Sequence, residues 1–113
     1  LDNIAALQPK VLVPGRGAAL TTPAQVSTGL SETRSFIAEM HAAVKAGVAA
    51  GKDLNAVYKD TYAALKPKYG HWVIFDHCLP FDVTRAYDEV TQHPDPRIWT
   101  AERDVEMWKA LES

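Results

Sequence analysis

The chain has 113 residues, of which 47% are apolar and 23% are charged, and its net charge is -2. This length suits one hydrophobic core, and the composition excludes a disordered chain. No stretch approaches the roughly 18 apolar residues that cross a bilayer, and the interspersed charges form no basic stripe, so we expect neither a membrane nor a nucleic acid as a partner.

Residues 1–21 predict a helical turn, a short strand and a glycine turn. Apolar side chains recur at helical spacing over residues 1–7 until Pro9, and the branched run 11–13 is typical of a buried strand. The turn Pro14-Gly15-Arg16-Gly17 follows directly. A lone strand has unpaired backbone groups, so we expect it to pair with a missing part of the chain or with a second copy.

A long amphipathic helix is expected over residues 22–51. Thr22 has the character of an N-cap, Pro23 suits the first helical position, and Gln25 can close a capping box, while Gly51 is a plausible C-cap. Its predicted inward positions are Val26, Leu30, Ile37, Met40, Val44 and Val48.

A second helix follows from Asp53, a predicted N-cap, and Pro67 is expected to end it at Lys66. The two helices form a hairpin over residues 22–66 with a very short turn. The expected inward positions of the second helix are Leu54, Val57, Tyr58, Thr61, Tyr62 and Leu65.

The second half predicts two further helices. Residues 69–80 allow a strand or a buried irregular segment, and we favour an irregular segment or one helical turn, because the apolar run 73–75 is too short for its periodicity to decide. Asp82 is expected to cap a helix that carries Val83, Ala86, Tyr87 and Val90 on one face, and Thr100 to start a last helix that carries Val105, Trp108 and Leu111. The fold class is therefore mainly α, with a helical hairpin, two further helices and one or two short N-terminal strands.

Few residues suggest chemistry. Arg16 lies between two glycines that bring a side chain close to a ligand, so it is a candidate for binding an anion, although a solvated arginine on a tight turn remains the alternative. His41, His71, His77 and His93 lack the spacing of a zinc site, and Cys78, the single cysteine, excludes a disulfide and is more typical of a small buried residue than of a nucleophile. We predict no catalytic residue and no metal ligand in this chain.

Three segments resemble one known family. "KVLVPGRGAALTTPAQV" (10–26), "FDHCLPFDVTRAYDE" (75–89) and "PRIWTAERDVEMWKAL" (96–111) are similar to the C-terminal portion of metallo-β-lactamase-fold hydrolases, in particular the bacterial β-lactamase-like branch with sulfur-oxidation and quinoprotein-associated members. In that family a Pro-Gly-His-Gly turn often provides a zinc ligand. Here Arg16 stands at the histidine position, and a guanidinium cannot donate a lone pair to a metal.

The resemblance implies a division of the chain. Residues 1–21 would end the αββα metallo-hydrolase core, and residues 22–113 would be a helical C-terminal extension that covers the active site or makes dimer contacts. The family's His-x-His-x-Asp-His motif is absent here, so zinc is expected in a longer parent, and the chain without a leading methionine suggests residues upstream.

The expected partners are the upstream catalytic core and a second copy of the chain, because the long helix in isolation would expose part of its apolar face. We expect a soluble protein of the bacterial cytoplasm or periplasm. The alternative function is a helical interaction or dimerisation module with no role in catalysis.

Overall fold

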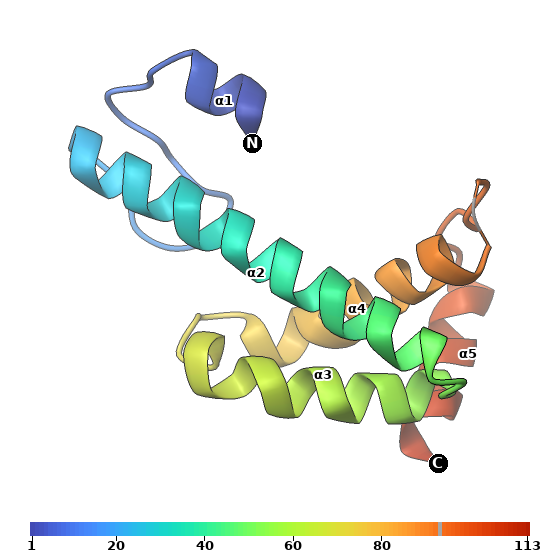
Figure 1. The fold of residues 1–113 in the computed structure, drawn as a ribbon. Helices are drawn as coiled ribbons and strands as arrows, with labels where there is room; N and C mark the ends of the chain where they lie inside the picture. Colours follow the sequence, from blue (N-terminus) through green and yellow to red (C-terminus); the bar gives the residue numbers. More distant parts are fainter. Residues whose placement is uncertain (93) are drawn as a thin grey trace. The chain divides into compact units, whose positions relative to one another are not determined.

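The computed structural model describes residues 1–92 and 94–113, and Figure 1 shows its helices. These are α1 (Asp2–Ala6), α2 (Pro23–Ala49), α3 (Leu54–Tyr69), α4 (Phe75–Thr91) and α5 (Ala101–Glu112). The fold is all-α, which confirms the predicted helical class with its hairpin, two further helices and N-terminal helical turn. The chain forms two compact units, Leu1–Ala38 and Glu39–Ser113, whose boundary lies within α2.

The predicted N-terminal strand is wrong. Leu12 and Leu20 exchange two backbone hydrogen bonds of 2.9 and 2.8 Å, and this isolated antiparallel bridge is the whole of the pairing among the described residues. Val11 and Val13 are 54% and 76% exposed. A strand needs a ladder of such bonds, and among the residues that the structure describes the branched run has no neighbouring strand to pair with.

The start of α2 confirms the predicted capping box. The N–H of Gln25 donates to the Thr22 hydroxyl at 3.2 Å, and the Gln25 side-chain oxygen accepts from the N–H of Thr22 at 3.3 Å and of Thr21 at 2.9 Å. These bonds satisfy donors that the first turn of a helix would otherwise leave unpaired. Val26 is buried as predicted, whereas Ile37, predicted to point inward, is 47% exposed.

The end of α2 confirms Gly51 as the C-cap and begins the helical hairpin of the second unit. The N–H of Gly51 donates to Val48 and the N–H of Lys52 donates to Gly47, a Schellman motif that requires the left-handed φ of +74° at Gly51. Gly47 lies against Val57 of α3, and a Cβ at Gly47 would be 2.8 Å from a Val57 methyl group. The missing side chain at Gly47 therefore permits the close approach of the two helices.

Helix α3 begins at the predicted cap but passes the predicted end. The Asp53 carboxylate accepts from the N–H of Ala56 at 2.9 Å. Pro67 lies inside the last turn, where it removes one donor, and the helix continues to Tyr69 because that side chain is only 7% exposed. Burial of Tyr69 offsets the lost hydrogen bond. Of the predicted inward positions, four are buried and two are half-buried: Leu54, Val57, Thr61 and Leu65, then Tyr58 and Tyr62.

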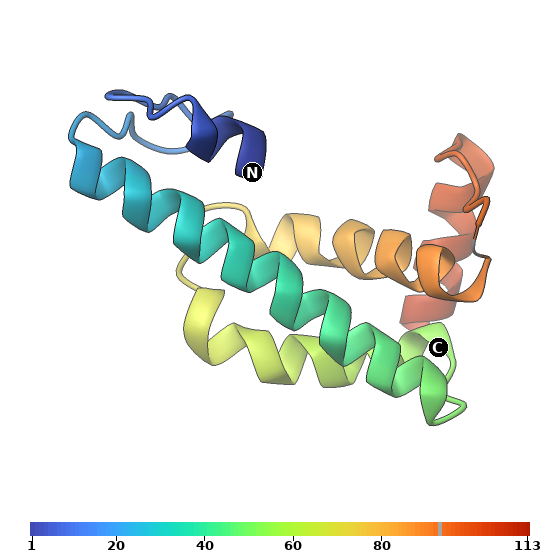
Figure 2. The ribbon, with the colours of Figure 1, turned by 45° about the horizontal axis from the view of Figure 1, so that its top comes forward.

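Helix α4 begins seven residues before its predicted cap at Asp82, so that cap is wrong, and of the segment 69–80, expected to be irregular or one helical turn, only residues 70–74 lie outside the helices. The helix starts at Phe75, and Pro80 lies within it. Phe75, Leu79 and Val83 are buried at helical spacing, and this continuous apolar face outweighs the hydrogen bond that Pro80 cannot make. Figure 2 shows α3 and α4 lying alongside each other, with α5 at the far end of α4 from the α3–α4 connection.

Helix α5 has the predicted N-cap, but two of its three expected apolar positions are exposed. The Thr100 hydroxyl accepts from the N–H of Arg103 at 3.2 Å. Arg103 and Met107 are buried and Leu111 is half-buried, whereas Val105 and Trp108 are 50% and 41% exposed. The reason is an ion pair: Arg103 donates to both carboxylate oxygens of Asp88 on α4, at 2.7 and 2.9 Å. This bidentate contact fixes the orientation of α5.

Candidate functional site

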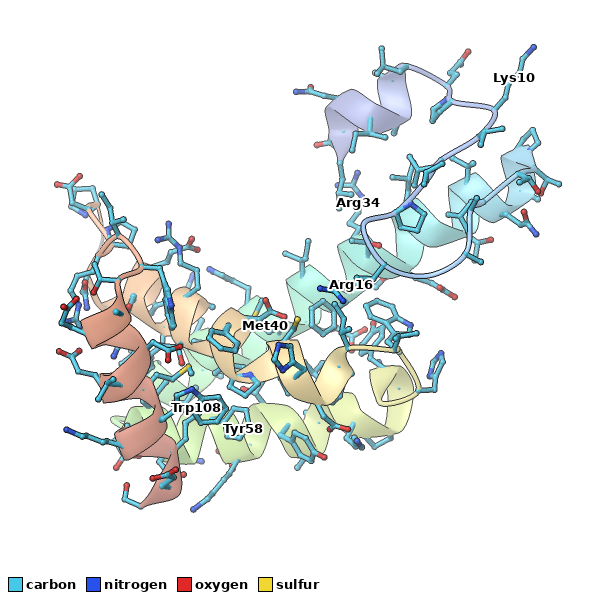
Figure 3. The ribbon with its side chains drawn as sticks, turned by 180° about the vertical axis from the view of Figure 1, so that it is seen from behind. Lys10, Arg16, Arg34, Met40, Tyr58 and Trp108 are labelled. Atoms are coloured by element: carbon cyan, nitrogen blue, oxygen red, sulfur yellow. The ribbon has the colours of Figure 1, made fainter. Side chains whose placement is uncertain are left out.

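Arg16, the predicted anion-binding residue, lies in an exposed loop that the Leu12–Leu20 bridge closes. Figure 3 shows the side chain at the bend of this loop. Gly17 has a φ of +95°, a conformation that favours glycine, while a Cβ at Gly15 would meet no atom within 4 Å. The glycine that shapes the turn is therefore the one after Arg16, and the guanidinium is presented outward on a closed loop.

The histidines and the cysteine do not converge in the described part of the chain. His41, His71 and His77 are exposed, Cys78 is a half-buried free thiol, and the ring of His77 lies 6.1 Å from that of Phe81. His93 lies outside the described residues. Within them there is no group of three or more histidine, cysteine or acidic side chains that could hold a metal ion.

A polar cluster that sequence reasoning missed joins α3 to the first turn of α4. Lys66 donates to both oxygens of Asp76 at 2.7 Å, and the Tyr62 hydroxyl donates to the same carboxylate at 3.0 Å. The Lys66 ammonium also lies 5.3 Å from the centre of the Tyr62 ring and 5.4 Å from that of Phe75. Tyr62 and Lys66 share a helix face, but Asp76 falls in the segment expected to be irregular, so no signal linked the three.

The charges of this cluster suit binding rather than proton transfer. The hydrogen bond from Lys66, followed by that from Tyr62, lowers the pKa of Asp76. The hydrogen bond to Asp76 raises the pKa of Lys66. Both groups are therefore ionised at neutral pH, and neither has the intermediate pKa of a general acid or base.

A surface groove of 470 Å³ adjoins the cluster and is lined by Tyr58, Lys59, Tyr62 and Asp76. Burial raises the pKa of Tyr58, so its phenol stays protonated and can serve as a hydrogen-bond donor. The tyrosine rings lie 6.0 Å apart. The groove therefore offers aromatic faces, one phenol donor and one ammonium to a ligand, but no activated nucleophile.

A second groove of 480 Å³ lies between the last turns of α2, the end of α4 and the segment that follows. Its lining residues are His41, Lys45, Glu89, Val90, Pro94 and Pro96. Glu89 accepts a hydrogen bond from Arg85 at 2.9 Å, which leaves Lys45 as the charged group of the lining without an ion pair among the described residues. Both grooves have the volume of small-molecule sites, and the described residues that line them form no catalytic arrangement.

Comparison with known proteins adds no assignment. No family model and no curated protein matches this sequence. Among the described residues, no helix combines the length and the apolar character that crossing a membrane requires. Any function must therefore be argued from the residues themselves.

Proposed function

We propose that this chain is the C-terminal region of a zinc-dependent metallo-β-lactamase-like hydrolase. Residues 1–21 would complete the catalytic core, and residues 22–113 would cover the active site or hold subunits together. The chain alone would be inactive. The resemblance of residues 10–26, 75–89 and 96–111 to that family motivates the proposal, and the structure supplies a separate supporting observation.

That observation is the state of the segment before the glycine turn. Val11 and Val13 are strongly exposed, and within the described residues neither has a backbone hydrogen-bond partner. An apolar, branched segment in which Val11 and Val13 keep unpaired backbone groups is suited to join the edge of a sheet, where these groups and the side chains would both be satisfied. The upstream catalytic core is the proposed source of that sheet.

Arg16 is the residue that would bind the substrate. Pairing of residues 11–13 with the core would bring the closed loop, and with it the guanidinium, to the position where the family places a zinc-binding histidine. A planar, permanently charged fork there would hold a carboxylate or phosphate group of the substrate through paired hydrogen bonds.

In this proposal the upstream core would hold the zinc, since the described residues include no set of side chains that fits a metal ion. A zinc centre in the upstream core would supply a metal-bound hydroxide that attacks an ester, amide or thioester. The contribution of this chain would be to orient the anionic end of the substrate and to limit access of water.

The test uses the longer parent and the isolated 113-residue chain. The sequence upstream should contain a His-x-His-x-Asp-His motif, and the parent should bind zinc while the isolated chain binds none. Replacing Arg16 by alanine should raise KM for anionic substrates by about tenfold or more, with a smaller change for neutral ones. Arg34→Ala, a change at another exposed arginine, is the matched control. Zinc-dependent hydrolysis by the isolated chain would overturn the proposal.

A second function, a helical interaction module without catalysis, is favoured by one observation. Phe81 contacts Trp99 and Trp108, with ring centres 5.5 and 6.0 Å apart, and both tryptophans are more than one third exposed. Such half-exposed aromatic groups are enriched at protein interfaces. An upstream sequence without the zinc motif would favour this second function.

A further inference from the structure

The outward face of α5 is apolar at its centre. Ala101, Val105, Trp108 and Glu112, which we call the outer stripe, follow one another at intervals of four, three and four residues and are all exposed. This spacing places them along one side of the helix, as in the seam of a coiled coil. The buried residues Arg103 and Met107 lie on the other side.

Although Phe81 contacts Trp108, much of this stripe stays exposed. Val105 is 50% and Trp108 is 41% exposed, and Ile98 and Trp99, which precede the helix, are 85% and 36% exposed. Figure 3 shows Trp108 on α5 and Tyr58 on α3, two helices that contact each other. Four large apolar side chains within eleven residues form a patch of the kind that marks a protein interface.

We propose that the outer stripe packs antiparallel against the same stripe of a second copy of this chain. The inference specifies the surface that the oligomerisation role in the proposed function would use, and it rests on that role. The sequence predicted self-association through the long helix, but Met40 and Val44 of α2 are buried in the second unit. We therefore assign the self-association to α5 instead.

Side-chain register favours a second copy as the occupant. In an antiparallel pair centred between Val105 and Trp108, each Val105 faces a Trp108 of the second copy, and each Ala101 faces a Glu112. A small residue then meets the longer one at both ends, and a branched residue meets the indole at the centre. The stripe is thus complementary to itself under a two-fold axis.

The charges near the stripe favour an antiparallel over a parallel arrangement of the two α5 helices. The same register brings Lys109 of one copy to the same flank of the seam as Glu102 of the other, and in the described part of the chain neither side chain forms an ion pair. A parallel pair would instead bring Glu112 of one copy against Glu112 of the other at the end of the stripe. Like charges at short range oppose that arrangement.

The patch extends beyond α5, which a stable dimer requires. A twelve-residue helix is only about 18 Å long, whereas stable interfaces bury about 800 Å² on each partner. Ile98, Trp99 and Phe81 continue the apolar surface beyond the stripe. The proposed interface therefore includes the segment before α5 and the adjoining face of α4.

The first experiment measures the mass of the 113-residue chain by sedimentation equilibrium from about 1 to 100 μM. We expect a dimer, and we expect Val105→Glu to weaken it at least tenfold, since the change puts a carboxylate at the centre of the seam. Val73→Glu is the matched control, because Val73 is 83% exposed in the connection between α3 and α4. Far-UV circular dichroism checks that both variants remain helical.

The second experiment tests the direction, with Cys78→Ser as background to remove the native thiol. Ala101→Cys mixed with Glu112→Cys should form a disulfide-linked dimer, while Ala101→Cys alone should not under the same conditions. Lys109→Glu should weaken the dimer, and the double variant Lys109→Glu with Glu102→Lys should restore it.

Three outcomes would overturn this inference: a monomer at 100 μM, a dimer unaffected by Val105→Glu, or efficient cross-linking of Ala101→Cys with itself. None of these outcomes contradicts the proposed function, because that proposal is tested by the upstream motif and the metal content of the parent. Conversely, a parent without zinc would overturn the proposed function and leave the measured dimer in place.

Discussion

Residues 10–20 and helix α4 both carry large apolar side chains, yet only those of α4 are buried. Phe75, Leu79 and Val83 are at most 4% exposed, whereas Val11 and Val13 are more than half exposed. The difference lies in what surrounds them: α4 packs against α3, while residues 11–13 have one backbone bridge nearby. An apolar run leads to burial only where the described chain also supplies the opposing surface.

Polar groups show the same contrast. In the second unit, the buried Arg103 and Asp88 satisfy each other, while the Asp2–Arg34 ion pair of the first unit is largely exposed, with side-chain accessibilities of 87% and 51%. Exposed pairs contribute little to stability, and disruption of buried ones is costly. We therefore expect the second unit to hold most of the folding free energy.

The largest expected effect is at the buried ion pair. Asp88→Ala leaves the buried Arg103 guanidinium with only its longer contact to Glu106, at 3.5 Å, so the free energy of unfolding should fall by about 3–5 kcal/mol. Urea unfolding followed by far-UV circular dichroism measures the change. Asp88→Ala combined with Arg103→Met should be less destabilised than Asp88→Ala alone, because no uncompensated charge remains.

The control for this change is Arg85→Ala, which breaks the half-exposed pair with Glu89 on the same helix. Its cost should stay below about 1 kcal/mol. Equal losses for Asp88→Ala and Arg85→Ala would mean that burial of the ion pair does not distinguish the second unit.

An intermediate effect compares the same substitution in the two regions. Leu79→Ala removes a side chain that is fully buried, and we expect a loss of about 2–5 kcal/mol. Leu7→Ala removes one that is 80% exposed and should change stability by no more than about 0.5 kcal/mol. A loss at Leu7 comparable to that at Leu79 would show that the N-terminal segment contributes to a core.

The smallest expected effect concerns Asp82, which lies in the middle of α4 instead of at its start. Burial raises the pKa of Asp82, so the folded state holds its proton more strongly than the unfolded state does. The ionised carboxylate therefore destabilises the fold at pH 7, and this penalty disappears as the pH falls through the folded pKa to the unfolded one.

Asp82→Asn should consequently gain about 0.5 kcal/mol at pH 7, and its advantage over the wild type should shrink in acid. Thermal unfolding at pH 7 and near pH 4 provides the measurement. A variant less stable than the wild type at pH 7 would mean that the Asp82 charge makes a favourable contact that outweighs its desolvation.

Features that depend on neighbouring residues were predictable in both units, whereas contacts between residues distant in sequence were not. The caps at Thr22, Asp53 and Thr100 and the turn at Gly51 follow from a few neighbouring residues, so the sequence identified them. Pro67 was expected to end a helix, and Pro80 lies inside a helix that was expected to begin after it, but burial of Tyr69 and Leu79 outweighs one lost hydrogen bond at each. Such burial depends on packing partners that a local pattern does not reveal.

The candidate site was predictable to a similar extent. The two glycines predicted an arginine on an exposed turn, and Arg16 occupies one. The cluster of Tyr62, Lys66 and Asp76 depends on where α4 begins, and an error of seven residues in that start separated Asp76 from its partners. The buried face of α5 was likewise decided by one long-range contact, between Arg103 and Asp88, rather than by helical periodicity.

The loop that carries Arg16 is tied at its base to the first turn of α2. Leu20 closes the loop through its bridge to Leu12, and the next two residues donate their N–H groups to Gln25 inside the helix. An anion that binds Arg16 only when the loop is closed would therefore raise the free energy needed to open that turn. The increase depends on how much more tightly the anion binds the closed loop than the open one. Hydrogen exchange at Gln25 and Val26 would then report occupancy at Arg16 from a distance along the chain.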